Sequence, residues 1–187
     1  MNIWYISPYS TEKNIGGCIN KTIKQLNAAP DDWIVHCDMD ILWLLPDSKA
    51  QVERILAVTD FDILSCMTNR LRSPEQLIGG KFIENDHIRD HIEIARKCRE
   101  NAGDYVKRAN SVVAAFMMCF RVSVWEQVSG FVEGVLNFDT QFCWEAQKIC
   151  EAKIGIMSGV YVWHSYRLEH KNPKQFIDHL LNKNNEN

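Results

Sequence analysis

The sequence has no excess of charge of one sign and no long apolar run. Its 21 basic and 24 acidic side chains leave a formal net charge of -3, which does not indicate a nucleic-acid-binding surface. The longest strictly apolar run, Val112 to Phe120, is far shorter than the roughly 20 residues that cross a bilayer as a helix. The start of the chain lacks the basic and then apolar order of a secretion signal. We therefore expect a cytoplasmic protein with no transmembrane segment and no nucleic-acid partner.

Closely spaced cysteine pairs are also missing. The seven cysteines are odd in number, and no two of them have the CxxC spacing of a zinc or redox site. Most lie in apolar stretches, where a reduced thiol behaves as a small hydrophobic side chain. We expect buried free thiols and no cysteine-bound metal.

Short apolar stretches alternate with amphipathic ones over about the first third of the chain. The pattern predicts strand 3–7, helix 12–26, strand 33–40, helix 47–58 and strand 61–67. This alternation is typical of an α/β fold with a mostly parallel central sheet flanked by helices. Ligands of such sheets lie beyond the carboxyl ends of the strands.

The rest of the chain is less regular. The predicted elements are a loop at 68–82, a helix at 86–101, a strand at 111–120, helices at 121–130 and 139–152, one or two strands at 153–166 and a final helix at 173–182. With 187 residues, 46% of them hydrophobic, the chain suits a single domain. We expect that domain over residues 1–182, followed by a disordered polar tail at 183–187.

Two acidic residues stand at the end of the second predicted strand. Residues i and i+2 of a strand share a face, so Asp38 and Asp40 can project together. Neighbouring carboxylates repel each other, and a bound divalent cation would remove that cost. Oxygen ligands with open coordination positions suit Mg2+ or Mn2+, which in turn bind phosphate groups. The alternative is that the two acids cap the turns between Trp43 and Pro46 or pair with a lysine, because short motifs often occur by chance.

Four segments resemble, in order, the characteristic blocks of glycosyltransferase family 2. They are KNIGGCIN (13–20), DDWIVHCDMDILWLLPD (31–47), VSGFVEGVLNFDTQFCWEA (128–146) and KIGIMSGVYVWHSYR (153–167). Several blocks in the right order are more specific than any one short motif. The resemblance implies a single GT-A domain, which is a Rossmann-like, nucleotide-sugar-binding fold. Its nucleotide-binding half would span about 1–70, and its acceptor and catalytic half about 71–170.

The resemblance also implies a metal centre formed by Asp38, Asp40 and His164. Asp38 would bind the ribose or a metal-bound water, and Asp40 would ligate the ion directly. His164, after the last apolar strand, matches the position of a further protein ligand, and its imidazole fits Mn2+ better than Mg2+. Considered by itself, His164 is more simply an ordinary core or surface histidine.

Asp139 matches the catalytic base of the family's acidic pair. An inverting sugar transfer needs a carboxylate that takes the proton of the acceptor hydroxyl as its oxygen attacks the anomeric carbon. The sequence departs from the family pattern here, because Phe138 replaces the first acid of the pair. Glu133 and Glu145 are the nearby substitutes if Asp139 is not the base. A carboxylate at Asp139 is also favourable simply as an N-cap or first-turn residue of a helix.

The resemblance places the nucleotide beside the end of the first strand. Ser7, Tyr9 and Asn14 would line its pocket, and Tyr9 or Tyr5 would stack on a pyrimidine ring. The alternative for both tyrosines is an ordinary core or surface position. Arg70, in a loop, would meet the diphosphate or be merely solvated.

His87 and His91 are spaced i,i+4 on the predicted helix at 86–101 and could bind a metal together. No third ligand is evident near them in the sequence. A solvated polar face shared with Asp86 and Asp90 is the expected arrangement.

The function implied by the resemblance is a metal-dependent, inverting transfer of a sugar from a UDP-sugar to a saccharide or other hydroxyl acceptor, with Mn2+ or Mg2+. Two alternatives stay open. A nucleotide-sugar-binding protein without turnover would explain Phe138. A haloacid-dehalogenase-like phosphatase would use a DxD strand end as well, although Leu42 stands where that motif has threonine or valine. The short chain also leaves room for a homo-oligomer or a partner subunit that completes the acceptor site.

Overall fold

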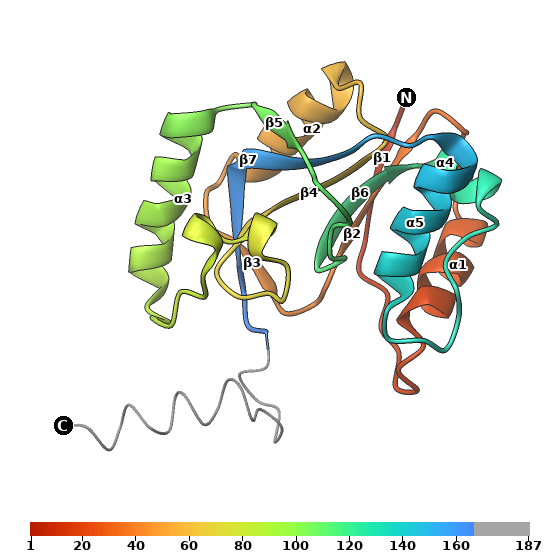
Figure 1. Ribbon diagram of the computed structural model, residues 1–187, viewed down its shortest axis with the longest axis horizontal. Coiled ribbons are helices and arrows are strands. Elements are labelled where there is room, and N and C mark those ends of the chain that lie inside the picture. The colour runs from red at the N-terminus through yellow and green to blue at the C-terminus, as the bar shows by residue number, and fades with distance from the viewer. Residues whose placement is uncertain (167–187) are drawn as a thin grey trace.

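The computed structural model describes residues 1–166, which form a mixed seven-stranded sheet with helices on both faces (Figure 1). The strands are β1 (Ile3–Ile6), β2 (Trp33–Cys37), β3 (Ile41–Trp43), β4 (Ile63–Thr68), β5 (Val106–Arg108), β6 (Met117–Arg121) and β7 (Ile154–His164). The helices are α1 (Ile15–Gln25), α2 (Ser48–Val58), α3 (Ile88–Ala102), α4 (Val122–Gln127) and α5 (Phe138–Cys150), with 3-10 turns η1 (Pro74–Gln76) and η2 (Ile78–Gly80). The predicted helix at 173–182 and the tail at 183–187 lie outside the described residues. Within residues 1–166, no helix is long and apolar enough to cross a membrane.

The strand order is β1-β2-β6-β4-β7-β3, and β5 pairs with β7. Only the β1–β2 and β4–β7 pairs are parallel; β6 runs antiparallel to both β2 and β4, and β3 and β5 run antiparallel to β7. The predicted α/β class is confirmed, but the prediction of a mostly parallel sheet is wrong. An apolar run shows that a strand is buried on both faces, but it does not show the direction of the strand.

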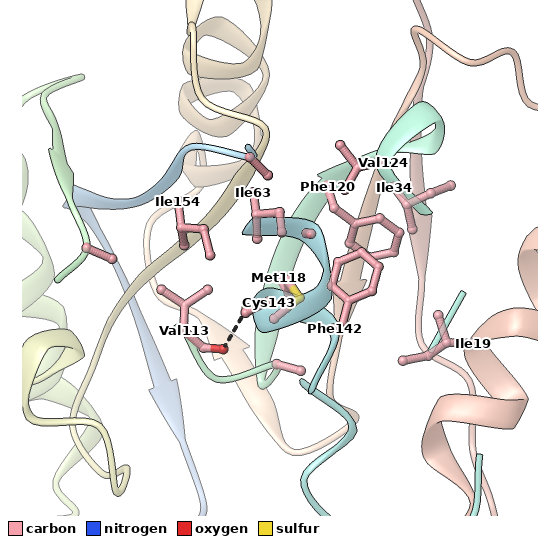
Figure 2. Close-up of a cluster of buried hydrophobic side chains, with 14 of the residues drawn as sticks. Ile19, Ile34, Ile63, Val113, Met118, Phe120, Val124, Phe142, Cys143 and Ile154 are labelled. Atoms are coloured by element: carbon pink, nitrogen blue, oxygen red, sulfur yellow. Dashed lines mark hydrogen bonds between the residues drawn. The ribbon is translucent and has the colours of Figure 1, made fainter. Parts of the chain in front are cut away.

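The alternation of side chains along the central strands builds two cores, one on each face of the sheet. On β2, Ile34 belongs to one core and Val35 to the other; on β6, Phe120 and Cys119 divide in the same way. The first core joins β6 to α5, where the rings of Phe120 and Phe142 meet edge to face with centroids 5.2 Å apart (Figure 2). Side chains of α2 fill the second core. Figure 1 shows α1 beside α5 at one end of the sheet and α3 at the other end, next to β7.

Strand β7 is one long strand with an irregularity in its middle. Its first part pairs with β4 up to Met157, and pairing resumes at Tyr161, so that 158–160 form a bulge. The bulge lies against the turn after α3, where the side chain of Gln51 donates hydrogen bonds to the carbonyl oxygens of Gly103 (2.8 Å) and Gly159 (3.4 Å). Beyond the bulge, β7 continues to His164 and pairs with β3. The bulge therefore sets where the end of β7 lies.

We predict that Gly159→Ala destabilises the protein by about 2–3 kcal/mol, because overpacking a filled site forces backbone shifts. A Cβ atom at this position would lie 1.9 Å from the carbonyl oxygen of Gly103. Urea denaturation measures the change, and Ser158→Ala in the same bulge is the control. Equal stability of the Gly159 variant and the wild type would contradict the close packing of the bulge.

Candidate metal and catalytic site

Two acids and a histidine from distant parts of the chain meet at one edge of the sheet. Asp38 follows β2, and Asp40 precedes β3, whose Ile41 pairs directly with His164 at the end of β7. One ligand atom of each of Asp38, Asp40 and His164 lies within 4.8 Å of the others. The structure thus brings together the three residues that the sequence predicts as metal ligands.

The protein holds His164 from several sides. The Asn69 side chain exchanges two hydrogen bonds with the His164 backbone, at 2.7 Å and 3.1 Å. The imidazole stacks on the ring of Phe116, with centroids 5.2 Å apart, and its side chain is only 4% exposed. Its Nδ1 lies 3.2 Å from the carbonyl oxygen of Arg70. Because a carbonyl only accepts, Nδ1 carries a proton, and in a neutral imidazole it would carry the only one.

Nε2 of His164 then directs a lone pair toward Oδ1 of Asp40, 3.4 Å away. Two acceptors that face each other at this distance need a cation or a second ring proton between them. A metal-ligating histidine commonly donates its other N–H to a backbone carbonyl, as His164 does to Arg70. The donor set of two carboxylates and one imidazole is suited to Mn2+, and the half-exposed acids leave room for further ligands.

Asp40 is also anchored by the residue after the strand. The Ser165 hydroxyl donates to Oδ2 of Asp40 (2.9 Å), and the Ser165 N–H donates to the Asp40 carbonyl (3.0 Å). Burial alone would raise the pKa of Asp40, but a second ring proton on Nε2 of His164 and the Ser165 hydroxyl outweigh burial, so in the absence of a cation the pKa lies below its ordinary value. Asp40 is therefore a carboxylate at neutral pH.

Asp139 lies in the first turn of α5 and is linked to this cluster through a short segment. Its Oδ2 accepts a hydrogen bond from the Ala115 N–H (3.2 Å), and its Oδ1 accepts one from Thr140 (2.7 Å). The next residue, Phe116, accepts a hydrogen bond from the Asp38 N–H (2.8 Å) and stacks on His164. Burial raises the pKa of Asp139, although the two backbone N–H groups oppose the shift. A raised pKa at such a site is typical of a general base.

The remaining predicted site residues lie in the loop after β1 and in the loop after β4. Since β1 and β2 are parallel, the loop from Ser7 to Asn14 begins at the edge where Asp38 lies. Ser7 and Tyr9 are exposed there. Asn14 caps α1: its Oδ1 accepts hydrogen bonds from Gly17 (3.0 Å) and from Gly134 (2.8 Å). Asn14 therefore ties this loop to the segment that precedes α5.

Arg70 and His91 differ from what the sequence suggests. The Arg70 guanidinium is fully buried, where it forms an ion pair with Asp86 and donates a hydrogen bond to the Glu84 carbonyl (3.0 Å). The part of Arg70 that contacts the candidate ligands is its backbone carbonyl, which accepts a hydrogen bond from His164. His91 was expected on a solvated face, and this expectation is wrong. Its ring is buried, with Nδ1 2.7 Å from the Tyr161 hydroxyl.

Four residues around the ligands were not foreseen: His36, Asn69, Phe116 and Ser165. Asn69 and Ser165 are polar residues just after buried strands, a signal that the sequence does contain. Phe116 lies in an apolar run, where nothing in the sequence sets it apart. Phe116 contacts Asp38 and His164 only because the segment that leads into β6 passes beside them.

No model of a known protein family matches this sequence, and a comparison with curated proteins finds no match. The case for a function therefore depends on the geometry of the site. That geometry consists of three candidate ligands at the edge where β2 and β7 end, and the partly buried carboxylate of Asp139 one short segment away.

We predict that the protein binds Mn2+ and that Asp40→Ala weakens the affinity about tenfold or more, because it removes a charged ligand. Electron paramagnetic resonance of free Mn2+ measures binding directly. Asp104→Ala is the matched control, since Asp104 has the same 46% side-chain exposure but pairs with Arg54 on the surface. Equal affinity of the Asp40 and Asp104 variants would contradict the assignment.

Proposed function

We propose that this chain is a metal-dependent glycosyltransferase of GT-A type that transfers a sugar from a UDP-sugar to a hydroxyl acceptor with inversion. The observation that carries the proposal is the convergence of Asp38, Asp40 and His164, with the partly buried Asp139 joined to them through Ala115 and Phe116. The exposed loop after β1, at the same edge, supports a nucleotide position there.

In this proposal the protein supplies three functions. Asp38, Asp40 and His164 would hold Mn2+ or Mg2+, which when bound offsets the charge that develops on the departing diphosphate. Asp139 accepts the proton of the acceptor hydroxyl as that oxygen bonds to the anomeric carbon and the bond from that carbon to the diphosphate breaks. Attack on the face opposite the leaving group inverts the configuration. Ser7, Tyr9 and Asn14 would contact the nucleotide.

A second candidate is a nucleotide-sugar-binding protein without turnover. Both oxygens of Asp139 already accept backbone hydrogen bonds, and Phe138 stands where the family pattern has an acid. Binding of UDP in the presence of Mn2+, with no UDP release from any UDP-sugar across a broad acceptor panel, would favour this candidate.

We predict that Asp139→Asn lowers the rate of UDP release from the cognate UDP-sugar by about 10²–10⁴-fold, the usual contribution of a general base. The variant keeps the affinity of the wild type for Mn2+ and UDP, because Asp139 contacts neither in the proposal. Glu145→Gln, an exposed acid on the same helix, is the control and keeps full activity. Loss of activity in the Glu145 variant alone would show that Asp139 is not the base.

The raised pKa of Asp139 gives two pH-dependent expectations. The rate of transfer increases with pH as the base loses its proton, with a midpoint above the ordinary aspartate value of about 3.9. The folded protein holds this proton more tightly than the unfolded chain, so ionisation costs stability as pH rises through the folded pKa. Asp139→Asn removes this titration, so the variant lacks the fall in stability that the wild type shows as pH rises through the folded pKa. Its amide NH2 also replaces one of the two oxygens that accept backbone N–H groups, so the two proteins are compared by the pH dependence of their stability and not by its level at one pH. Urea denaturation across pH and a pH–rate profile test both expectations, and the same pH dependence of stability in variant and wild type would contradict the shift.

A further inference from the structure

His36 is a buried polar residue next to the last residue of β2, and the proposed chemistry does not use it. It is 1% exposed, and it shares a face of the sheet with Ile34. Its neighbours across the two adjacent strands are Ile6 on β1 and Met118 on β6. An apolar side chain would suit this position, so the choice of an imidazole needs another explanation.

The contacts of its two ring nitrogens differ. Nε2 lies 3.2 Å from Oδ1 of Asp38, whereas Nδ1 is buried with no hydrogen-bond partner among residues 1–166. A carboxylate only accepts hydrogen bonds, so Nε2 must carry a proton. His36 is thus a donor aimed at Asp38, and the protein keeps it in place although its other nitrogen is unsatisfied.

We propose that His36 is a positioning residue for the metal site: its Nε2–H holds Oδ1 of Asp38 and leaves Oδ2 for the cation. The inference rests on the proposed function, because it assumes that Asp38 serves a cation. Asp38 is 38% exposed and follows the last residue of β2, so its side chain has few other restraints. Asp40 is oriented in the same way by the Ser165 hydroxyl. Each acid of the pair therefore has its own donor from the protein.

The test compares three substitutions of His36 by Mn2+ affinity, measured by electron paramagnetic resonance at a temperature where circular dichroism shows each variant folded. His36→Leu removes the donor, and the affinity falls about 10–100-fold, the usual effect of losing a partner of a metal ligand. His36→Gln places an amide nitrogen near the position of Nε2 and restores most of the affinity. His36→Asn is too short to reach Asp38 and behaves like His36→Leu. Ile34→Val is the packing control and binds Mn2+ like the wild type.

A second measurement separates positioning from a general packing effect. In a background of Asp38→Ala, His36→Leu causes no further loss of Mn2+ affinity, because the residue through which His36 acts is absent. The inference is overturned if His36→Leu and His36→Asn bind Mn2+ like the wild type, or if the loss is the same in the Asp38→Ala background. If the wild type itself binds no Mn2+, the proposed metal site fails, and the inference fails with it. The two failures are distinguished by the wild-type measurement.

Discussion

The antiparallel pairing of β3 with the end of β7 is the constraint on which the site depends. Only 38–40 separate β2 from β3, so the chain reverses sharply and Ile41 comes opposite His164. A slip of one residue would turn the side chains of β3 to the opposite face. It would also move Asp40 away from the imidazole. The bulge around Gly159 sets where the end of β7 lies, and the Asn69 side chain then fixes the His164 backbone.

This arrangement places several hydrogen-bond acceptors close together, with ligand atoms of Asp38, Asp40 and His164 within 4.8 Å of one another. Asp38 and Asp40 are acids, and Nε2 of His164 directs a lone pair toward Asp40 when Nδ1 donates to the Arg70 carbonyl. The protein offsets part of the repulsion with donors, since the Ser165 hydroxyl holds Asp40 and His36 holds Asp38. A cation among the three would convert the remaining repulsion into attraction. The same grouping thus explains both the unusual acids in an apolar stretch and the buried imidazoles around them.

Much of the fold and the pairing of the two acids could be predicted from local pattern, whereas the place of His164 beside them was implied only by the family resemblance. Hydrophobic periodicity identifies the strands and helices of the first third, and the i, i+2 spacing places both acids on one face. The sheet direction could not be predicted, since β6 is buried on both faces and would read the same in either direction. The polar residues around His91 on α3 predict a solvent-exposed side chain. In the structure the His91 ring is buried and forms a hydrogen bond with the Tyr161 hydroxyl. Such partners come from distant segments, and no local pattern reveals them.

The link from Asp139 to the ligands gives the site its proposed chemistry. Ala115 and Phe116 connect the partly buried carboxylate of Asp139 to both Asp38 and His164, so Asp139 and the three candidate ligands are held by one segment just before β6. A donor bound at the ligands would therefore lie near a group that is able to take a proton. The proposed reaction requires such a link, because a carboxylate can take the acceptor's proton only if it is held close to the bound donor.

The most direct test of the central claim is X-ray diffraction from crystals of the protein soaked in Mn2+, measured on both sides of the manganese absorption edge. One anomalous difference peak is expected between Asp40, His164 and Oδ2 of Asp38, with Nε2 of His36 still donating a hydrogen bond to Oδ1 of Asp38. Fully soaked crystals with no peak among these three residues, or with the strongest peak elsewhere, would contradict it.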